Sequence, residues 1–338
     1  MCLTKIFSSQ DYRNLITMNT TNTSVKTSHR NPLQQFLYNV RKNRTLLIML
    51  APAVILIFLF AYMPMGGIIL AFKEYTYRDG ILGSPWVKNP LSNFKFFYIS
   101  GKMALVTINT FTYNLSFIIV NTTLAVGLAV ILNEVKNKYF KKATQSFIFL
   151  PYFVSWVIVG SIAYSILNYE SGALNTFLKS INSEPVNIYG TPPAWRWILV
   201  LFNAWKGVGY SMVVYLAAIA GVDTSLYEAA SIDGANVFQR IRYILLPTIR
   251  PTIITLVLLD ISKIFRGNFD LFYQLVGTNG ALYDTTDVID TFVFRSLLES
   301  SDIGMASASG FYQSVLCFVI IMVVNFVVKR INADYALF

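Results

Sequence analysis

The sequence predicts an all-α integral membrane protein with six transmembrane helices, and three observations carry this prediction. The 338 residues are 55% hydrophobic and only 13% charged, whereas a typical soluble chain is about 25% charged. Six apolar stretches have the length needed to cross a bilayer, which is about 20 residues. The basic residues are concentrated in alternate connecting segments, as expected for a chain that crosses a membrane repeatedly.

Four of the six apolar stretches contain no Asp, Glu, Lys or Arg, and a fifth is interrupted only by Lys206. The remaining one, next to last along the chain, holds four charged residues and is the least regular. The predicted spans are residues 45–72, 103–133, 143–169, 197–222, 251–277 and 303–328. We therefore expect an N-terminal tail (1–45), a transmembrane domain (46–328) and a short C-terminal segment (329–338).

Charge sets the predicted orientation. The tail, the second and fourth connecting segments and the C-terminal segment together hold 16 Lys and Arg against six Asp and Glu. The opposite side holds eight against nine, although the first outer loop alone has five basic residues. Because cytoplasmic loops are rich in Lys and Arg, we expect both termini to be cytoplasmic. The tail lacks an apolar core followed by a cleavage site, so we expect no signal peptide.

The residue inventory excludes several kinds of chemistry. The single histidine is His29 in the polar tail, and the two cysteines, Cys2 and Cys317, lie at opposite ends of the chain. These residues supply neither a catalytic triad nor a metal site. No GxxxxGK[ST] stretch is present, so any ATP must be bound by another chain. A chain this apolar is also a poor nucleic-acid binder despite its net charge of +10. We therefore expect no enzyme activity, no metal and no cofactor in this chain.

The fourth connecting segment, residues 223–250, has the punctuation of two short helices. Ser225 can cap the first, with Glu228 at capping-box spacing. Gly234 can supply the left-handed residue that stops it. Asn236 can then cap the second helix, with Gln239 at the matching position.

Prolines and apolar spacing complete the predicted helix pair. Pro247 is expected to end the second helix, and Pro251 to open the next transmembrane helix. Apolar residues repeat at helical spacing on both short helices. Such a pair fits either a docking element for a partner protein or an interfacial helix lying on lipid headgroups.

Seven residues of this loop match the EAA signature of the permeases of binding-protein-dependent ABC importers, at both of its spacings. They are Glu228, Ala229, Ala230, Gly234, Ile244, Leu246 and Pro247. Residues 46–330 resemble the sugar-permease branch of that family, and are most similar to permeases for oligosaccharides or polysaccharides. Residues 268–273 and 304–308 contribute to this likeness.

The resemblance implies a mechanism and a set of partners. In this family the EAA loop is a coupling helix that docks in a cytoplasmic ATPase, which binds ATP and magnesium. Because six helices cannot enclose a central path alone, it implies a second permease subunit of similar size, with which this chain forms a heterodimer. It also implies two ATPase subunits and an extracytoplasmic solute-binding protein. Glu228 can serve docking or capping, the small Ala229 and Ala230 allow close approach, and Gly234 permits the bend.

Charged residues within the predicted spans mark candidates for a substrate path, since they are costly at membrane depth. Asp260 and Lys263 are three residues apart, and Arg266 and Asp270 are four apart, so each pair is expected to share a helix face. The pairs fit either self-neutralisation inside a helix bundle or a polar translocation path. Polar and aromatic side chains suited to sugars lie nearby, at Asn268 and Tyr273.

The fourth span holds three further candidates for the path, Trp205, Lys206 and Tyr210. The lysine lies about ten residues into the span, too deep to reach the headgroups easily. Neighbouring glycines indicate tight packing or a broken helix. The two aromatic rings fit stacking on a sugar or packing against lipid and other helices.

The sequence thus predicts a non-catalytic permease subunit of an ATP-driven carbohydrate importer, located in the bacterial cell membrane. The alternative is a secondary transporter driven by an ion gradient. Such transporters usually contain internal repeats, and residues 46–170 and 197–328 show no convincing one.

Overall fold

The computed structural model describes residues 32–99, 101–331 and 336. His29 and most of the predicted N-terminal tail lie outside these residues, as does most of the predicted C-terminal segment. Contacts divide the chain into two units, residues 1–64 and 65–338. The described part of the first unit consists of α2 (Pro32–Lys42), α3 (Arg44–Ile57), the π-helix η1 (Phe58–Tyr62) and the start of the 3₁₀-helix η2 (Met63–Phe72).

Among the described residues of the second unit, the regular elements are helices, apart from one isolated antiparallel bridge between Lys73 and Trp86. Two short helices precede its first long helix, α4 (Gly80–Gly83) and α5 (Ser92–Ile99). Then follow α6 (Lys102–Glu134), α7 (Lys138–Phe149), η3 (Leu150–Phe153), α8 (Trp156–Leu167), α9 (Ala173–Ser180), η4 (Ile188–Gly190) and α10 (Pro192–Ala220). The rest are α11 (Thr224–Ile232), α12 (Val237–Arg240), η5 (Ile241–Leu245), α13 (Leu246–Ile261), α14 (Phe269–Val276), η6 (Gly280–Leu282), α15 (Tyr283–Thr286), α16 (Ile289–Ser300) and α17 (Ile303–Ile331).

The predicted all-helical membrane fold is confirmed, with five helices in the described residues that are long and apolar enough to span a bilayer, or six if one bent pair of helices counts as a single span. The five are Arg44–Phe72, Lys102–Glu134, Pro192–Ala220, Val237–Ile261 and Ile303–Arg330. Their exposed surfaces are rich in large apolar side chains, as lipid contact requires.

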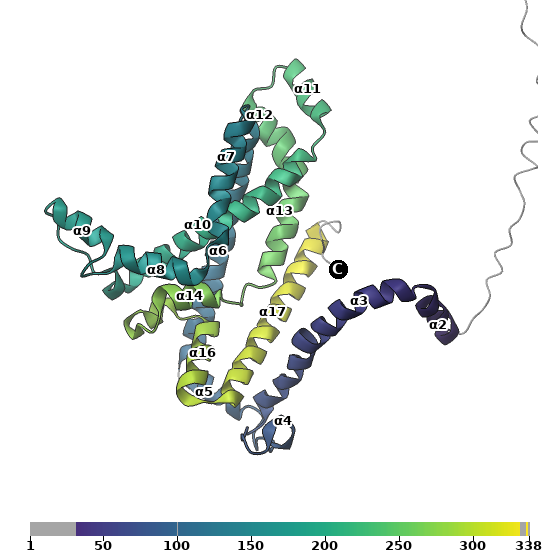
Figure 1. Cartoon of the computed structure of the whole chain (residues 1–338), viewed down its shortest axis with the longest axis vertical. Helices are drawn as coiled ribbons and strands as arrows, with labels where there is room; N and C mark the ends of the chain where they lie inside the picture. Colours follow the sequence, from purple (N-terminus) through teal and green to yellow (C-terminus); the bar gives the residue numbers. More distant parts are fainter. Residues whose placement is uncertain (1–31, 100, 332–335, 337–338) are drawn as a thin grey trace, which may run out of the picture. The chain divides into compact units, whose positions relative to one another are not determined.

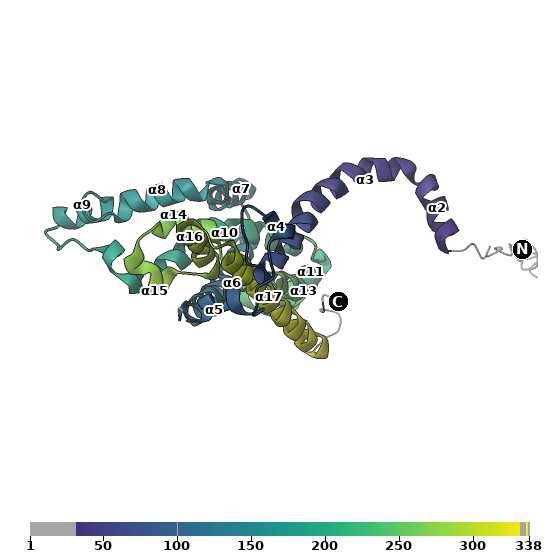
Figure 2. The ribbon, with the colours of Figure 1, turned by 90° about the horizontal axis from the view of Figure 1, so that it is seen from below.

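The predicted third span is not one helix. It consists of Lys138–Phe153 and Trp156–Leu167, which meet at an angle of 95°. Pro151 lies in the 3₁₀ turn at the break, and Ser155 starts α8 by accepting a hydrogen bond from the amide of Ile158. Accordingly α7 appears lengthwise in Figure 1 and nearly end-on in Figure 2, where α8 is seen lengthwise.

The predicted fifth span, 251–277, is also wrong in its boundaries. A continuous helix runs from Val237 to Ile261, so Pro247 does not end the second short helix and Pro251 does not open a new one. The π-turn of η5 directly precedes Pro247, and such turns accommodate local disruption of the helical ladder. Thr248 and Thr255 also donate their hydroxyls to carbonyl oxygens four residues earlier.

The core of the second unit is the contact between α6 and α10. Ala125 and Ala129 of α6 are completely buried, and their spacing of four residues allows the two backbones to approach closely. Around them, α10 and α13 contribute Met212, Tyr215 and Ile249. A separate buried cluster joins α6, α8, α10 and α14.

The EAA loop and the segment that follows α13 lie at opposite ends of one long helix. The short helices α11 and α12 lie at one end of the second unit, whereas α5 and α16 lie at the other (Figure 1). From α12 the chain passes along α13 and then turns into α14. This arrangement places the EAA loop at one end of a long helix and the charged residues 260–270 at its other end.

Candidate functional site

The EAA loop is held in shape by its own neighbours in sequence. Asp223, rather than Ser225, caps α11: its carboxylate accepts a hydrogen bond of 2.9 Å from the amide of Ser225. This carboxylate's pKa is lowered by the hydrogen bonds from Ser225. The helix ends as predicted at Gly234, whose φ of +74° lies in the left-handed region, and the amide of Ala235 donates to the carbonyl of Ala230.

The second short helix begins as the sequence predicts. Asn236 accepts a hydrogen bond from the amide of Gln239, and the Gln239 side chain accepts one from the amide of Asn236. These reciprocal bonds form a capping box. The loop therefore has a defined conformation before any partner binds.

The EAA residues lie on the surface of this loop. Glu228 and Ala229 are exposed and Ala230 is half-buried. Because Asp223 provides the cap, the carboxylate of Glu228 has no hydrogen-bond partner among the described residues. Two large apolar side chains, Ile232 and Phe238, are 86% and 84% exposed. The exposed surface thus combines an unengaged carboxylate, small residues and apolar side chains.

The loop is attached to α6 by charged and aromatic residues that sequence reasoning missed. Arg240 forms an ion pair of 3.7 Å with Glu134 at the end of α6, and both side chains are about one-third exposed or less. The hydroxyl of Tyr227 and Nε of Arg240 are buried without a hydrogen-bond partner. Burial raises the pKa of Tyr227, and the charge of Glu134 raises it further, against the effect of Arg240. The sequence feature that could have predicted this ion pair is Glu134, the one acidic residue in the lysine-rich segment 134–142.

At the other end of α13, residues 262–268 form a turn instead of continuing the helix. Three side chains from three different helices hold it. Asn114 of α6 donates to the carbonyls of Ile264 and Arg266, at 2.8 and 3.0 Å. Gln313 of α17 donates to the carbonyl of Phe265 at 2.7 Å. These bonds satisfy the backbone polar groups that the break would otherwise leave unpaired.

The third side chain is Asp290 of α16, which accepts a hydrogen bond of 2.6 Å from the amide of Gly267 and one of 2.9 Å from Gln313. A Cβ at position 267 would lie 2.7 Å from the Asp290 carboxylate, so only glycine fits there without displacing it. Burial raises the pKa of Asp290, whereas these hydrogen bonds and the charge of Arg266 lower it.

The turn forms one wall of a polar cavity of about 290 Å³. Four of the predicted path residues meet there: Asp260, Lys263, Arg266 and Asn268. The other lining residues are Asn114, Phe117, Ile118, Asn121, Asn203 and Gly267. The predicted helix-face pairs are wrong, because the helix ends at Ile261 before either pair is complete; no ion pair joins their members among the described residues.

Asp270 and Tyr273 lie on α14 and line other surfaces. Asp270 is exposed in the first turn of the helix. The ring of Tyr273 stacks on Phe269 with centroids 5.1 Å apart and meets Phe294 edge-on. It lines a second cavity of about 230 Å³ between α14 and α16.

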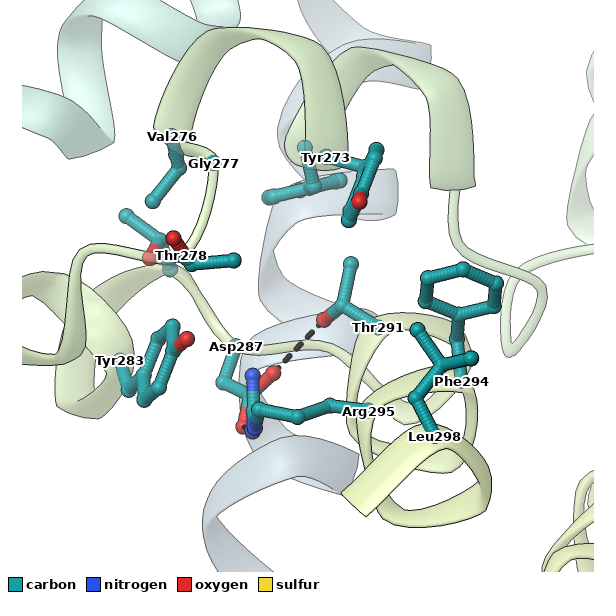
Figure 3. A pocket seen from close by; sticks show the side chains of 12 residues that line it. Tyr273, Val276, Gly277, Thr278, Tyr283, Asp287, Thr291, Phe294, Arg295 and Leu298 are labelled. Carbon is teal, nitrogen blue, oxygen red and sulfur yellow. Dashed lines mark hydrogen bonds and ion pairs between the residues drawn. The ribbon is translucent and has the colours of Figure 1, made fainter.

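Figure 3 shows this second cavity, with Tyr273, Tyr283 and Arg295 around it. Arg295 pairs with the buried carboxylate of Asp287 and lies 3.8 Å from the ring centroid of Tyr283. Thr291 donates to the same carboxylate at 2.7 Å. Burial acts to lower the pKa of Arg295, but Asp287 raises it on balance. The arginine is therefore a satisfied, permanently charged group.

A third and larger cavity, about 890 Å³, lies between α8 and the end of α14. Hydroxyl and amide groups line it, among them those of Ser161, Ser165, Gln274 and Asn279. An unbroken third span would not form this cavity, because α8 contacts α14 only as a result of the bend. The sequence therefore did not predict it.

Lys206 supports the bend in the third span. Its amine donates to the carbonyls of Tyr152 and Val154, at 2.7 and 2.6 Å, and lies 5.4 Å from the ring centroid of Trp156. A lysine in the middle of α10 therefore satisfies backbone groups left free where α7 ends. These contacts give Lys206, which the sequence predicts as a candidate for the substrate path, a structural role.

The residues near Lys206 on α10 differ in how closely they pack against other helices. Gly209 packs tightly, since a Cβ there would lie 2.3 Å from the carbonyl oxygen of Ile148. Tyr210 stacks on Tyr152 with ring centroids 4.9 Å apart. Trp205 remains 45% exposed. None of the three predicted candidates on α10 lines the cavity at the turn.

Comparison with known proteins identifies the family. Residues 122–333 match the family model of the binding-protein-dependent transport system inner membrane component. Protein LplB of Bacillus subtilis (strain 168) is 30% identical over 295 residues, covering 87% of this chain and 92% of that protein. The polygalacturonan/rhamnogalacturonan transport system permease protein YteP of the same organism is 31% identical over 304 residues, covering 89% and 92%.

Solved structures agree with this result. A chain of a bacterial ABC transporter involved in the import of the acidic polysaccharide alginate superposes with a TM-score of 0.79 and 31% identity, over 88% of this chain and 99% of that one. A chain of the bacterial alginate ABC transporter in complex with its alginate pentasaccharide-bound periplasmic protein gives a TM-score of 0.77. This chain therefore belongs to the family of inner membrane components of binding-protein-dependent transport systems.

Proposed function

We propose that this chain is one permease subunit of an ATP-driven ABC importer in the bacterial cell membrane, and that its cargo is an oligosaccharide. The observation that carries the proposal is the continuous helix Val237–Ile261. The exposed EAA loop lies at one end of it and the turn of the polar cavity at the other. At about 1.5 Å per residue, its 25 residues span about 37 Å.

The helix suggests how the two sites are linked. When a partner moves the EAA loop, a rigid helix carries the displacement to residues 262–268, which form a wall of the cavity. Rigid-body motion of this kind is one of the established ways in which proteins switch between states. Glu228, Ala229, Ala230 and Gly234 would form the contact with the partner. Ile244, Leu246 and Pro247 lie where the loop passes into the long helix.

The partners follow from what this chain lacks. The likeness to the inner membrane components of ABC importers supports two ATPase subunits, which would bind ATP and magnesium on the EAA side. A second permease subunit would complete the path, and an extracytoplasmic solute-binding protein would deliver the cargo. The basic segments beside α7 and within the EAA loop support a cytoplasmic position for that end, and with it for both termini.

The cargo is proposed from the chemistry of the cavity and from the relatives. One relative is named for polygalacturonan and rhamnogalacturonan and another for alginate, which are sugar polymers. In this chain, Asn121, Asn203 and Asn268 bring amide groups into the cavity. Each amide offers a donor and an acceptor, as sugar hydroxyls require.

The test is uptake by the reconstituted complex of both permeases, the ATPase and the binding protein in proteoliposomes. We expect accumulation of an oligosaccharide that requires ATP and persists in the presence of a proton uncoupler. Uptake that is abolished by the uncoupler and independent of ATP would contradict the proposal, since it would indicate transport driven by an ion gradient.

A further inference from the structure

The cavity at the turn contains two cationic side chains that form no ion pair among the described residues, although the charge of Lys263 acts on Asp260 and that of Arg266 on Asp290. Lys263 and Arg266 both line it, and neither forms an ion pair with any described residue. Asp260 is the one carboxylate among the lining residues. The cavity wall therefore carries an excess of positively charged side chains. Cations within a membrane protein are costly unless they are compensated, so this excess calls for an explanation.

The nearest additional acid does not remove the excess from the cavity wall. Asp290 lies behind the turn, where its Oδ2 accepts the hydrogen bonds from Gly267 and Gln313. It does not line the cavity. Its carboxyl group is thus engaged in holding the backbone that carries Lys263 and Arg266.

The backbone that carries the two cations is held in position. Both lie on the turn that Asn114, Gln313 and Asp290 clamp from three helices. Backbone hydrogen bonds within the turn, from the amide of Arg266 to the carbonyl of Lys263, add to this rigidity. A held backbone limits the arrangements open to the two side chains, so less conformational freedom is lost when they bind an anion.

The neutral part of the cavity fits a sugar ring. Asn121 lines it, and its Oδ1 is buried without a hydrogen-bond partner. Such an acceptor is costly to leave unsatisfied, and a hydroxyl group would satisfy it. The volume of about 290 Å³ lies close to the lower end of the range of about 300–1,000 Å³ that is usual for small-molecule sites.

We propose that the cavity binds an acidic saccharide, with the carboxylate of a hexuronate residue held by Lys263 and Arg266 and its ring hydroxyls by asparagine amides. Arginine suits this role because its planar guanidinium can bind both oxygens of a carboxylate. The inference rests on the proposed function and narrows it from oligosaccharides in general to uronate-containing ones.

The experiment measures saccharide binding by isothermal titration calorimetry to the complex of permeases and ATPase in nanodiscs, without the solute-binding protein. The probes are trigalacturonate, its methyl ester and maltotriose. The ester keeps the rings and hydroxyls but lacks the charge. We expect trigalacturonate to bind at least tenfold more tightly than the ester or maltotriose. We expect Lys263→Gln or Arg266→Gln to weaken its binding by about 10- to 100-fold, as for hydrogen bonds to a charged group.

Two matched variants make the result specific. Lys179→Gln removes an exposed lysine on α9, away from the cavity, and should leave binding unchanged. Arg266→Lys keeps the positive charge but loses the planar guanidinium that can bind both carboxylate oxygens. This variant should retain part of the affinity for trigalacturonate. Thermal unfolding of each variant separates loss of the site from loss of the fold.

Equal binding of trigalacturonate and its ester, a preference for maltotriose, or no binding of any probe would overturn the inference. Unchanged affinity in both glutamine variants would do the same. The proposed function fails separately, if the complex with its binding protein shows no ATP-dependent uptake of any saccharide.

Discussion

The EAA loop and the turn at residues 262–268 interrupt the same run of helix at opposite ends, but they are held by different means. The loop takes its shape from hydrogen bonds between residues two to five positions apart, such as Asp223 with Ser225 and Asn236 with Gln239. The turn is held by side chains from α6, α16 and α17, as much as 152 positions away. The loop can therefore keep its conformation while it moves. The conformation of the turn, in contrast, depends on the positions of α6, α16 and α17.

This difference has a functional consequence. A locally folded loop suits a docking element, since it presents one shape to its partner in every state of the transporter. A turn clamped by three helices suits a gate or binding wall, since movement of any of these helices alters it. The predictions below test the two parts separately.

The largest effect is expected at the bend of the loop. Replacing Gly234 with valine forces a β-branched residue into the left-handed backbone region, which costs an L-residue about 1–2 kcal/mol even without β-branching. A cost of about 1.4 kcal/mol corresponds to a tenfold change in an equilibrium constant. We therefore expect the population of the native bend to fall about tenfold or more, and sugar uptake per ATP hydrolysed to fall with it. Measurement of uptake and ATPase activity on the same proteoliposomes checks this.

The matched control is Gly234→Asn, because asparagine tolerates the left-handed conformation and no atom lies within 4 Å of the new Cβ. This variant should keep most of the coupling. Full coupling in the valine variant would show that the bend plays no part in transmission.

A smaller effect is expected at the turn. In Gly267→Ala the new Cβ would lie 2.7 Å from the Asp290 carboxylate, which must move and lose its hydrogen bond to the amide of residue 267. We expect a loss of about 1–3 kcal/mol in unfolding free energy, as for a buried group left unsatisfied. Uptake should fall while the ATPase still co-purifies with the permease.

Gly310→Ala in α17 serves as the control, since nothing lies within 4 Å of its added Cβ. If both alanine variants behave like the unmodified protein, the clamp on the turn is weaker than its geometry indicates.

The attachment of the loop to α6 should contribute less. Arg240 and Glu134 are partly exposed, and such pairs are worth about 0.2–1 kcal/mol. We expect Arg240→Glu to increase amide hydrogen exchange in α11 and α12. The double variant Arg240→Glu, Glu134→Arg should restore protection, whereas Arg242→Glu, an exposed neighbour, should have little effect. Failure of the charge exchange to restore protection would argue against a role for this ion pair.

The smallest expected effect is a pH dependence of the stability, which arises from Asp290 at the turn. The pKa of Asp290 is raised, mainly by burial, so between its ordinary value of 3.8 and its raised value the folded protein binds more protons than the unfolded one. Stability should therefore fall slightly as pH rises through this window. Thermal unfolding of the complex from acidic to neutral pH checks this, and Asp290→Asn should flatten the slope. The same slope in the variant would assign it to another group.

The loop could be predicted largely from sequence because its interactions are local. The glycine stop and the second cap were correct. The first cap was wrong, since Asp223, two positions before Ser225, provides it, and so was the predicted end of the second helix at Pro247. Spans were also predictable wherever apolar residues ran without interruption, as in α6 and α17.

The rest depended on distant residues. Pro247 and Pro251 looked like helix ends, because the π-turn at Ile241–Leu245 leaves no clear signal in the sequence. The apolar run at 143–169 looked continuous because the partner of its break, Lys206, lies more than 50 positions away. The spacing of Asp260, Lys263, Arg266 and Asp270 predicted helix-face pairs, whereas Asn114, Asp290 and Gln313 instead stabilise a turn.

The central claim is that the helix from Val237 to Ile261 transmits movement of the EAA loop as a rigid element. It is tested most directly by distances between spin labels in the reconstituted complex, after replacement of Cys2 and Cys317. Labels at Arg242→Cys and Leu259→Cys lie on either side of both prolines, about 25 Å apart at about 1.5 Å per residue. A third label position, Ile119→Cys on α6, provides the reference.

We predict that ATP binding leaves the distance between positions 242 and 259 unchanged and shifts the distance between positions 242 and 119. Doubly labelled complexes that still transport are the ones to measure. A change in the distance between 242 and 259 would show that the helix bends at its prolines, and would contradict rigid transmission from the loop to the cavity.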